Sequence, residues 1–189
     1  MGDGDDEAVW ARVCAGASAD FGIVWDRHRD HVHRYLITVG TDRADAEDLT
    51  AVVFRELWRR RRTVRFNDDG SLLPWLLATA RNVHRNAARS RRRFRAFLDR
   101  LPPPEPTAPA DRAIDATSDL VQVRQALATE TNPLDRELLG LTLEGMTIAE
   151  AAGTLGLTEA AAKTRLTRLR SRLRQRIAAQ EAPELETDR

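Results

Sequence analysis

The sequence has few of the residues on which disulfide-bonded, zinc-binding and membrane proteins depend. Its single cysteine, Cys14, cannot form an internal disulfide and has no second cysteine with which to build a zinc site. A small packed residue is the simplest interpretation of Cys14. No apolar run approaches the roughly 20 residues that a membrane helix needs, and the stretch from Met1 to Glu7 is acidic where a signal peptide would be basic. We therefore expect a cytoplasmic protein that contacts no membrane.

Aromatic residues make up only 5% of the chain, whereas 42% of its residues are hydrophobic and 31% are charged. This composition allows buried cores and argues against global disorder. A length of 189 residues suits one ordinary domain or two small helical ones. The three histidines between His28 and His33 do not combine with a carboxylate in metal-site spacing, so we expect neither a metal ion nor a cofactor.

The net charge of only +1 conceals a strong sorting of charge along the chain. Residues 1–58 carry 6 basic and 12 acidic side chains, whereas residues 59–95 carry 12 basic and 2 acidic ones. Residues 96–162 carry 4 basic and 11 acidic side chains, and residues 163–176 carry 7 basic and none acidic. Two basic blocks in an otherwise acidic chain suit a protein that touches a polyanion at two places and offers acidic surface to another partner.

Apolar residues recur at helical spacing in three stretches of the first half. The first stretch covers residues 21–39, and the second covers residues 42–58, with Asp42 as its cap. Turn-forming residues fill positions 64–70, after which Ser71 can cap a third helix. These stretches predict a small helical bundle.

Proline marks the boundary between two domains. Five of the nine residues from 101 to 109 are proline, so this segment is expected to be extended and exposed. The predicted fold class is all-α, with two small helical domains joined by this linker. The expected divisions are an N-terminal extension (residues 1–19), a first domain (20–97), the proline-rich linker (98–117), a second domain (118–178) and an acidic tail (179–189).

The second domain is predicted to contain a helix-turn-helix. Helices over residues 120–127 and 132–145 come first. Thr147 and the glutamate three residues later form a capping box for the next helix, which Gly156 ends. Thr158 then caps a last, basic amphipathic helix after a three-residue turn, which is the spacing of a helix-turn-helix.

The last helix is the predicted reader of duplex DNA. In a helix-turn-helix the second helix enters the major groove, its N-terminal residues meet base edges, and nearby cations hold phosphates. An antiparallel helix pair with a solvated basic face is the alternative. The residues expected to contact duplex DNA are Thr158, Glu159, Ala160, Lys163, Thr164, Arg165 and Arg168.

The first basic block differs from the second because aromatic and amide side chains lie among its arginines. Aromatic rings stack on unpaired bases and cations follow the backbone, so this block suits single-stranded nucleic acid. Trp75 is equally compatible with the protein core. The residues expected to contact the nucleic acid are Arg61, Arg65, Phe66, Asn67, Trp75, Arg81, Asn82, Arg85 and Asn86.

The helix over residues 42–58 is acidic on one side and aromatic on the other. DNA would repel it, so it is better suited to docking on a protein. A solvated helix face is the alternative. The residues expected to contact that protein are Asp45, Asp48, Leu49, Val52, Val53, Phe54 and Trp58.

Several stretches resemble the extracytoplasmic-function (ECF) sigma factors. Region 2 of this family is similar to Phe21-Gly-Ile-Val-Trp-Asp-Arg-His, Asp45-Ala-Glu-Asp-Leu-Thr-Ala-Val-Val-Phe and Pro74-Trp-Leu-Leu-Ala-Thr-Ala-Arg-Asn. Region 4 is similar to Asp135-Arg-Glu-Leu-Leu, Thr147-Ile-Ala-Glu-Ala-Ala-Gly-Thr-Leu-Gly-Leu and Lys163-Thr-Arg-Leu. The order of the two modules is more specific than either motif, and the resemblance covers about residues 20–178.

The resemblance implies that residues 45–58 dock on the clamp helices of the largest subunit of core RNA polymerase. It implies that the first basic block melts and reads the minus-ten promoter element, and that Lys163 with its neighbours reads the minus-thirty-five element in double-stranded DNA. An anti-sigma factor is a further partner that this family often has. Ala51 and the run over residues 159–162 depart from the family pattern, so the promoter sequence is not carried over.

Two other classes of function are weighed beside the sigma factor. A transcriptional regulator would bind DNA through residues 130–178 and work without core polymerase. A metal-dependent nuclease would need a coherent two-metal site, which the acidic residues Asp45, Glu47, Asp48, Asp68 and Asp69 do not form by their spacing. We therefore expect a protein that is not an enzyme.

Overall fold

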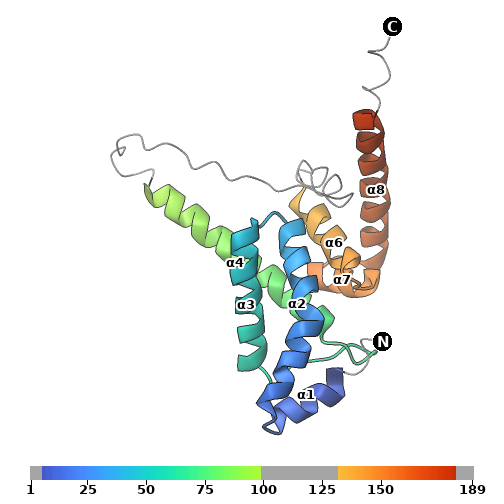
Figure 1. Cartoon of the computed structure of the whole chain (residues 1–189). Coiled ribbons are helices and arrows are strands. Elements are labelled where there is room, and N and C mark those ends of the chain that lie inside the picture. Colours follow the sequence, from blue (N-terminus) through green and yellow to red (C-terminus); the bar gives the residue numbers. More distant parts are fainter. Residues whose placement is uncertain (1–5, 99–131, 182–189) are drawn as a thin grey trace.

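The structure is a computed structural model that describes residues 6–98 and 132–181 (Figure 1). Every regular element within these two ranges is a helix, which confirms the predicted all-α class. Almost all of the proline-rich linker, the helix expected over residues 120–127 and most of the acidic tail lie outside the described residues.

Helices α2 (Phe21–Thr38), α3 (Arg43–Arg59) and α4 (Leu73–Leu98) pack against one another as the first bundle. The Asp42 carboxylate accepts a hydrogen bond from the Asp45 amide at 2.9 Å, so the predicted cap begins α3. The predicted cap of α4 is present as well, because Ser71 Oγ accepts a hydrogen bond from the amide at the start of that helix. Fully buried side chains from all three helices form the core, among them Leu36, Val53, Leu57, Leu76 and Ala80.

A fourth helix, α1 (Asp6–Cys14), lies within the residues that the sequence indicates only as an extension. It is followed by a short 3-10 helix, η1 (Ser18–Asp20), and packs on α2. Val9, Trp10 and Val13 are each only 3% exposed, so α1 belongs to the core of the first bundle. Cys14 is exposed, which corrects the expectation of a packed residue.

Asp6 joins α1 to the start of α4. Its carboxylate, which is fully buried, bonds His28 Nε2 at 2.7 Å and accepts a hydrogen bond from the Leu72 amide at 2.8 Å. Arg27 Nη1 donates to the other carboxylate oxygen. Burial alone would raise the pKa of Asp6, but the hydrogen bonds from His28, the Leu72 amide and Arg27 hold this pKa below its ordinary value. The helix therefore contributes a buried anion that orders the entry into α4.

The second unit consists of α6 (Pro133–Leu143), α7 (Ile148–Leu155) and α8 (Glu159–Glu181). Thr147 and Glu150 form the complete capping box of α7, as predicted. Gly156 has a left-handed backbone with φ of 69°, which ends α7 and turns the chain into α8. Thr158 Oγ1 accepts a hydrogen bond from the Ala161 amide at 3.2 Å and caps α8. The predicted helix-turn-helix is therefore present with its caps.

The two units are in contact. Helix α6 lies against α2, and α7 lies near the start of α4 (Figure 1). The backbone of Gly140 in α6 comes so close to α2 that an added Cβ would lie 3.1 Å from Tyr35 Cδ2. The sequence predicts two domains on a linker, and nothing in the sequence indicates that they touch.

Candidate nucleic-acid and polymerase interfaces

The predicted DNA-reading residues of the helix-turn-helix lie at the exposed start of α8. Glu159, Ala160, Lys163, Thr164 and Arg168 are all exposed, as is the cap residue before them. Lys163 Nζ forms an ion pair with Glu159 Oε1 at 2.6 Å, one helical turn away. On the opposite face Ala162, Leu166 and Leu169 are at most 1% exposed and hold α8 against the rest of the unit. The polar face of α8 is therefore open to a partner.

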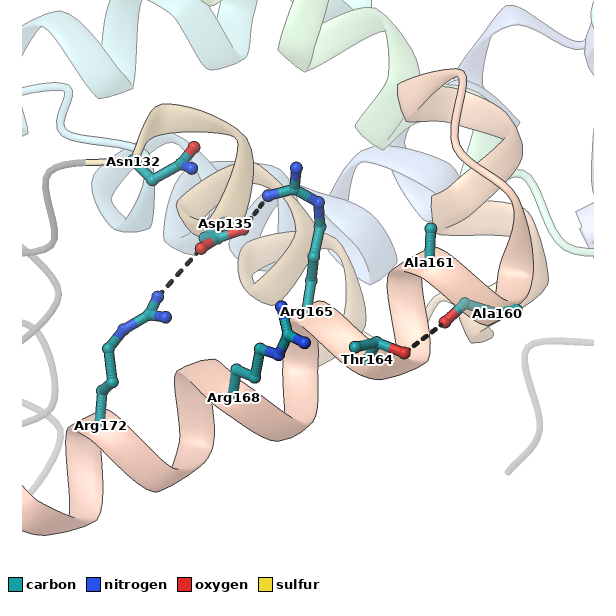
Figure 2. A pocket seen from close by; sticks show the side chains of 8 residues that line it. All are labelled: Asn132, Asp135, Ala160, Ala161, Thr164, Arg165, Arg168 and Arg172. Carbon is teal, nitrogen blue, oxygen red and sulfur yellow. Dashed lines mark hydrogen bonds and ion pairs between the residues drawn. The ribbon is translucent and has the colours of Figure 1, made fainter.

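A hollow of about 550 Å³ lies between this face of α8 and the first turn of α6. Figure 2 shows Arg165 and Arg172 reaching from α8 toward Asp135 on α6, with Arg168 between them along the helix. The Asp135 carboxylate accepts hydrogen bonds from Arg165 Nη1 at 2.9 Å and from Arg172 Nη2 at 3.0 Å. The other side chains that line the hollow are Asn132, Ala160, Ala161 and Thr164.

Asp135 was not among the predicted site residues, although it is the centre of this arrangement. Its side chain is 7% exposed, and it offsets the charge of two arginines that are 38% and 42% exposed. The sequence predicts that Arg165 contacts DNA. In the structure one of its guanidinium nitrogens instead donates a hydrogen bond to Asp135. Arg165 and Arg172 are seven residues apart, which is two helical turns and places both on the same face of the helix. This spacing is the feature of the sequence from which a shared partner could have been predicted.

The predicted contacts of the first basic block fall into separate places. Asn82 and Asn86 line a groove of about 470 Å³ between α3 and α4, and they share it with Leu49 and Val52. Asn67 and Arg81 instead face the helix-turn-helix unit. The groove therefore brings together residues that the sequence predicts for two different partners.

The remaining residues of the block differ in exposure. Arg65 and Arg85 are exposed, whereas Phe66 and Trp75 are half-buried and pack against the core. The guanidinium of Arg61 lies 4.9 Å from the centre of the Trp58 ring, and its carbonyl oxygen accepts the hydrogen bond of Trp10. Helix α1 therefore holds the backbone at the beginning of this block.

The acidic helix α3 presents only part of its predicted docking set. Asp48 is exposed, and Trp58 is 37% exposed. Asp45 forms an ion pair with Arg91 of α4, an arginine that was not singled out from the sequence. Val53 and Phe54 are 0% and 2% exposed, so we correct their assignment from the docking surface to the core. Five residues of the predicted docking set keep at least part of their side chain exposed: Asp45, Asp48, Leu49, Val52 and Trp58.

Comparison with known proteins agrees with this architecture. The family model of Sigma-70 region 2 matches residues 24–94, which span α2, α3 and most of α4. The ECF RNA polymerase sigma factor BldN of Streptomyces coelicolor is 31% identical over 160 residues, which cover 81% of this chain and 58% of BldN. The RNA polymerase sigma factor CarQ of Myxococcus xanthus is 29% identical over 163 residues, which cover 85% of this chain and 90% of CarQ. The chain is similar to ECF-type RNA polymerase sigma factors, and its α2–α4 bundle matches Sigma-70 region 2.

Solved structures resemble this chain over both units. CnrH in complex with the cytosolic domain of CnrY matches with a TM-score of 0.65 and 25% identity, over 92% of this chain and 97% of CnrH. The sigma factor RpoE in complex with the anti-sigma factor NepR from Bartonella quintana shares the fold, with a TM-score of 0.62 and 22% identity. The chain spans 58% of the length of BldN and 42% of that of RfaY of Xanthomonas campestris pv. campestris. In the part of the chain that the structure describes, no helix is long and apolar enough to cross a membrane.

Proposed function

We propose that this chain is a sigma factor that binds core RNA polymerase and directs it to promoters. The first bundle reads and melts the minus-ten element, and the helix-turn-helix unit reads the minus-thirty-five element. The observation that carries the proposal is the division of the surface into three parts: a helix-turn-helix with a cationic last helix, a second cationic block around α4, and the acidic helix α3. Such a surface contacts DNA twice and leaves α3 for a protein.

The two DNA contacts differ in chemistry. The exposed start of α8 suits the major groove, where Lys163 and Arg168 meet base edges or phosphates. The first block offers the amides Asn82 and Asn86 in a groove and the arginines Arg65 and Arg85 on the surface. Unstacking a base costs a few kcal/mol per step, and a surface that holds the unpaired bases offsets this cost and shifts the duplex toward opening.

The polymerase contact is assigned to α3. The exposed Asp48 and Trp58, with Leu49 and Val52 beside them, form a mixed acidic and apolar strip that suits the clamp helices of the largest subunit. In this mechanism the polymerase carries out the chemistry, and the sigma factor itself is not an enzyme and acts in the cytoplasm with no cofactor. An anti-sigma factor is a further partner, supported by the presence of NepR in the RpoE structure.

A co-elution and transcription experiment tests the proposal. The purified chain is mixed with core RNA polymerase and promoter DNA, and co-elution and transcripts are measured. Asp48→Arg is expected to abolish co-elution because it reverses an exposed charge on α3, whereas Asp30→Arg on α2, where the side chain is 70% exposed, leaves co-elution unchanged. Binding of DNA without co-elution by the unaltered chain would favour the transcriptional regulator that works without polymerase.

A further inference from the structure

Four consecutive arginines, residues 59–62, stand where α3 ends and the chain turns away from it. Together with Thr63 they line a hollow of about 310 Å³. Arg59, Arg60 and Arg62 are exposed, and Arg61 is half-buried. The sequence singles out only Arg61 among the four as a contact of nucleic acid. The hollow therefore adds three cations to those predicted for the first basic block.

One carboxylate lies beside this turn and offsets part of its charge. Glu56 Oε1 accepts a hydrogen bond from Arg59 Nη1 at 2.9 Å, and the other oxygen of Glu56 lies 3.8 Å from Arg60 Nε. The guanidinium of Arg61 lies over the Trp58 ring and donates to the Trp58 carbonyl oxygen at 3.2 Å. Four guanidinium groups against one carboxylate leave an excess of positive charge, which favours an anionic group in the hollow.

Helix α1 fixes the backbone of this turn. The indole Nε1 of Trp10 donates to the Arg61 carbonyl oxygen at 2.9 Å, and Cys14 Sγ donates to the same oxygen at 3.3 Å. Trp10 itself is 3% exposed, and its ring packs on Phe21 with centroids 6.1 Å apart. The residues that line the hollow do not include Trp10 or Cys14. The negative end of the Arg61 peptide is therefore directed toward α1 rather than into the hollow.

The same helix holds the far end of the connection between α3 and α4. The Asp6 carboxylate accepts a hydrogen bond from the Leu72 amide at 2.8 Å. Between these two attachments the chain closes on itself, because Asn67 Oδ1 accepts a hydrogen bond from the Ser71 amide at 2.8 Å. Helix α1 lies outside residues 24–94, which match Sigma-70 region 2, so that match assigns it no role.

We propose that the turn of residues 59–63 binds a backbone phosphate of the melted strand and that Trp10 is a positioning residue for this site. The inference rests on the proposed function, in which the first bundle holds single-stranded DNA. Guanidinium groups bind phosphate oxygens through paired N–H donors, and a fixed backbone lowers the entropic cost of that contact. Loss of the Trp10 hydrogen bond leaves every charge in place but frees the turn that presents the cations.

Trp10→Phe tests the positioning role without changing a charge. It keeps an aromatic ring in the core and removes the N–H donor to Arg61. Trp25→Phe on α2 is the matched control, because it makes the same change in an indole that packs on Phe54 with centroids 4.7 Å apart. Urea unfolding of both variants measures how far each substitution lowers the stability of the bundle.

Arg62→Gln tests the phosphate site directly. Arg62 is exposed, so the substitution leaves the core of the bundle unchanged. Arg55→Gln is its control, because it removes the same charge from an exposed position within α3, away from the residues that line the hollow.

Binding of a labelled single-stranded 20-mer of dT is titrated by fluorescence anisotropy at several salt concentrations, with a labelled 30-base-pair duplex in parallel. Each phosphate contact with a single strand contributes about 0.7 to the slope of log K against log salt. Loss of one contact therefore weakens binding by about eightfold at about 50 mM salt and by about threefold at about 200 mM. Trp10→Phe and Arg62→Gln both show this change. The two controls keep the slope of the unaltered chain, and duplex binding by all four variants stays within about twofold.

The results distinguish the phosphate site, its positioning and the proposed function. Arg62→Gln that binds the single strand as tightly as Arg55→Gln overturns the phosphate site. A folded Trp10→Phe with an unchanged slope overturns the positioning role, and so does an equal loss in Trp25→Phe. An equal loss on the duplex overturns the assignment of the site to the melted strand. If the unaltered chain binds no single strand at all, the proposed role of the first bundle fails and this inference fails with it.

Discussion

Replacing Asp135 with asparagine is expected to make DNA binding tighter and more sensitive to salt. Asp135 holds Arg165 and Arg172 through one hydrogen bond to each carboxylate oxygen. Asparagine keeps the shape of the side chain but removes its charge, so both guanidinium groups lose this anionic acceptor and bind phosphates more readily. The two arginines are 38% and 42% exposed, so water replaces part of the lost interaction and the cost in folding stability is small, about 1 kcal/mol.

The size of the effect follows from counterion release. Each phosphate that a protein cation neutralises makes the slope of log K against log salt steeper by about 0.9. Two released arginines therefore change the slope by at most about 1.8. Over a fourfold change in salt, from about 50 to 200 mM, this corresponds to an additional loss of about 12-fold in affinity for the variant.

The assay is fluorescence anisotropy of a labelled duplex over that range of salt. Asp30→Asn is the control, because it makes the same change in net charge at an exposed position on α2. Asp135→Asn should bind more tightly than the control at the lowest salt and approach it as salt rises. An unchanged slope, or weaker binding by Asp135→Asn at low salt, would refute the idea that Asp135 withholds these arginines from DNA.

Two further predictions concern stability. The pKa of Asp6 is lowered in the folded protein, so its contribution is complete above the ordinary pKa of about 4 and is lost as the pH falls through the folded value. Asp6→Asn should therefore lower the free energy of unfolding by about 1.5–3 kcal/mol at pH 7 and flatten its decline below pH 4, as measured by urea unfolding. Gly156 has φ of 69°, so Gly156→Val should cost about 1–3 kcal/mol in the same assay, whereas Gly153→Val in α7 should not.

Local signals in the sequence were sufficient for much of the fold. Asp42, Thr147 and Thr158 each cap the helix predicted after them, because a cap depends only on a few neighbouring residues. The left-handed Gly156 and the short turn beside it likewise indicate a helix-turn-helix without any distant contact. The all-α class and the exposed polar face of α8 follow from the same short-range rules.

Features that depend on distant residues could not be predicted in this way. Helix α1 has nine residues, too few for a decisive periodicity, and its role depends on a bond between Asp6 and an amide 66 positions away. The pattern of α3 placed Phe54 beside Trp58, but only the packing of α2 and α4 decides that Phe54 is 2% exposed and Trp58 is 37% exposed. The contact between Asn67 and Glu150 joins two predicted domains, and no local rule describes it.

The number of arginines in a basic block overstates how many phosphates that block can hold. Residues 163–176 carry seven cations, but at least three of them are paired, Lys163 with Glu159 and both Arg165 and Arg172 with Asp135. In the first block Arg81 and Arg91 are likewise bonded to carboxylates on other helices. The positive charge that this chain can offer to a phosphate is therefore set by its acids as well as by its cations. Asp135→Asn measures the effect of one such acid by itself, because it changes the charge available to DNA without altering a single arginine.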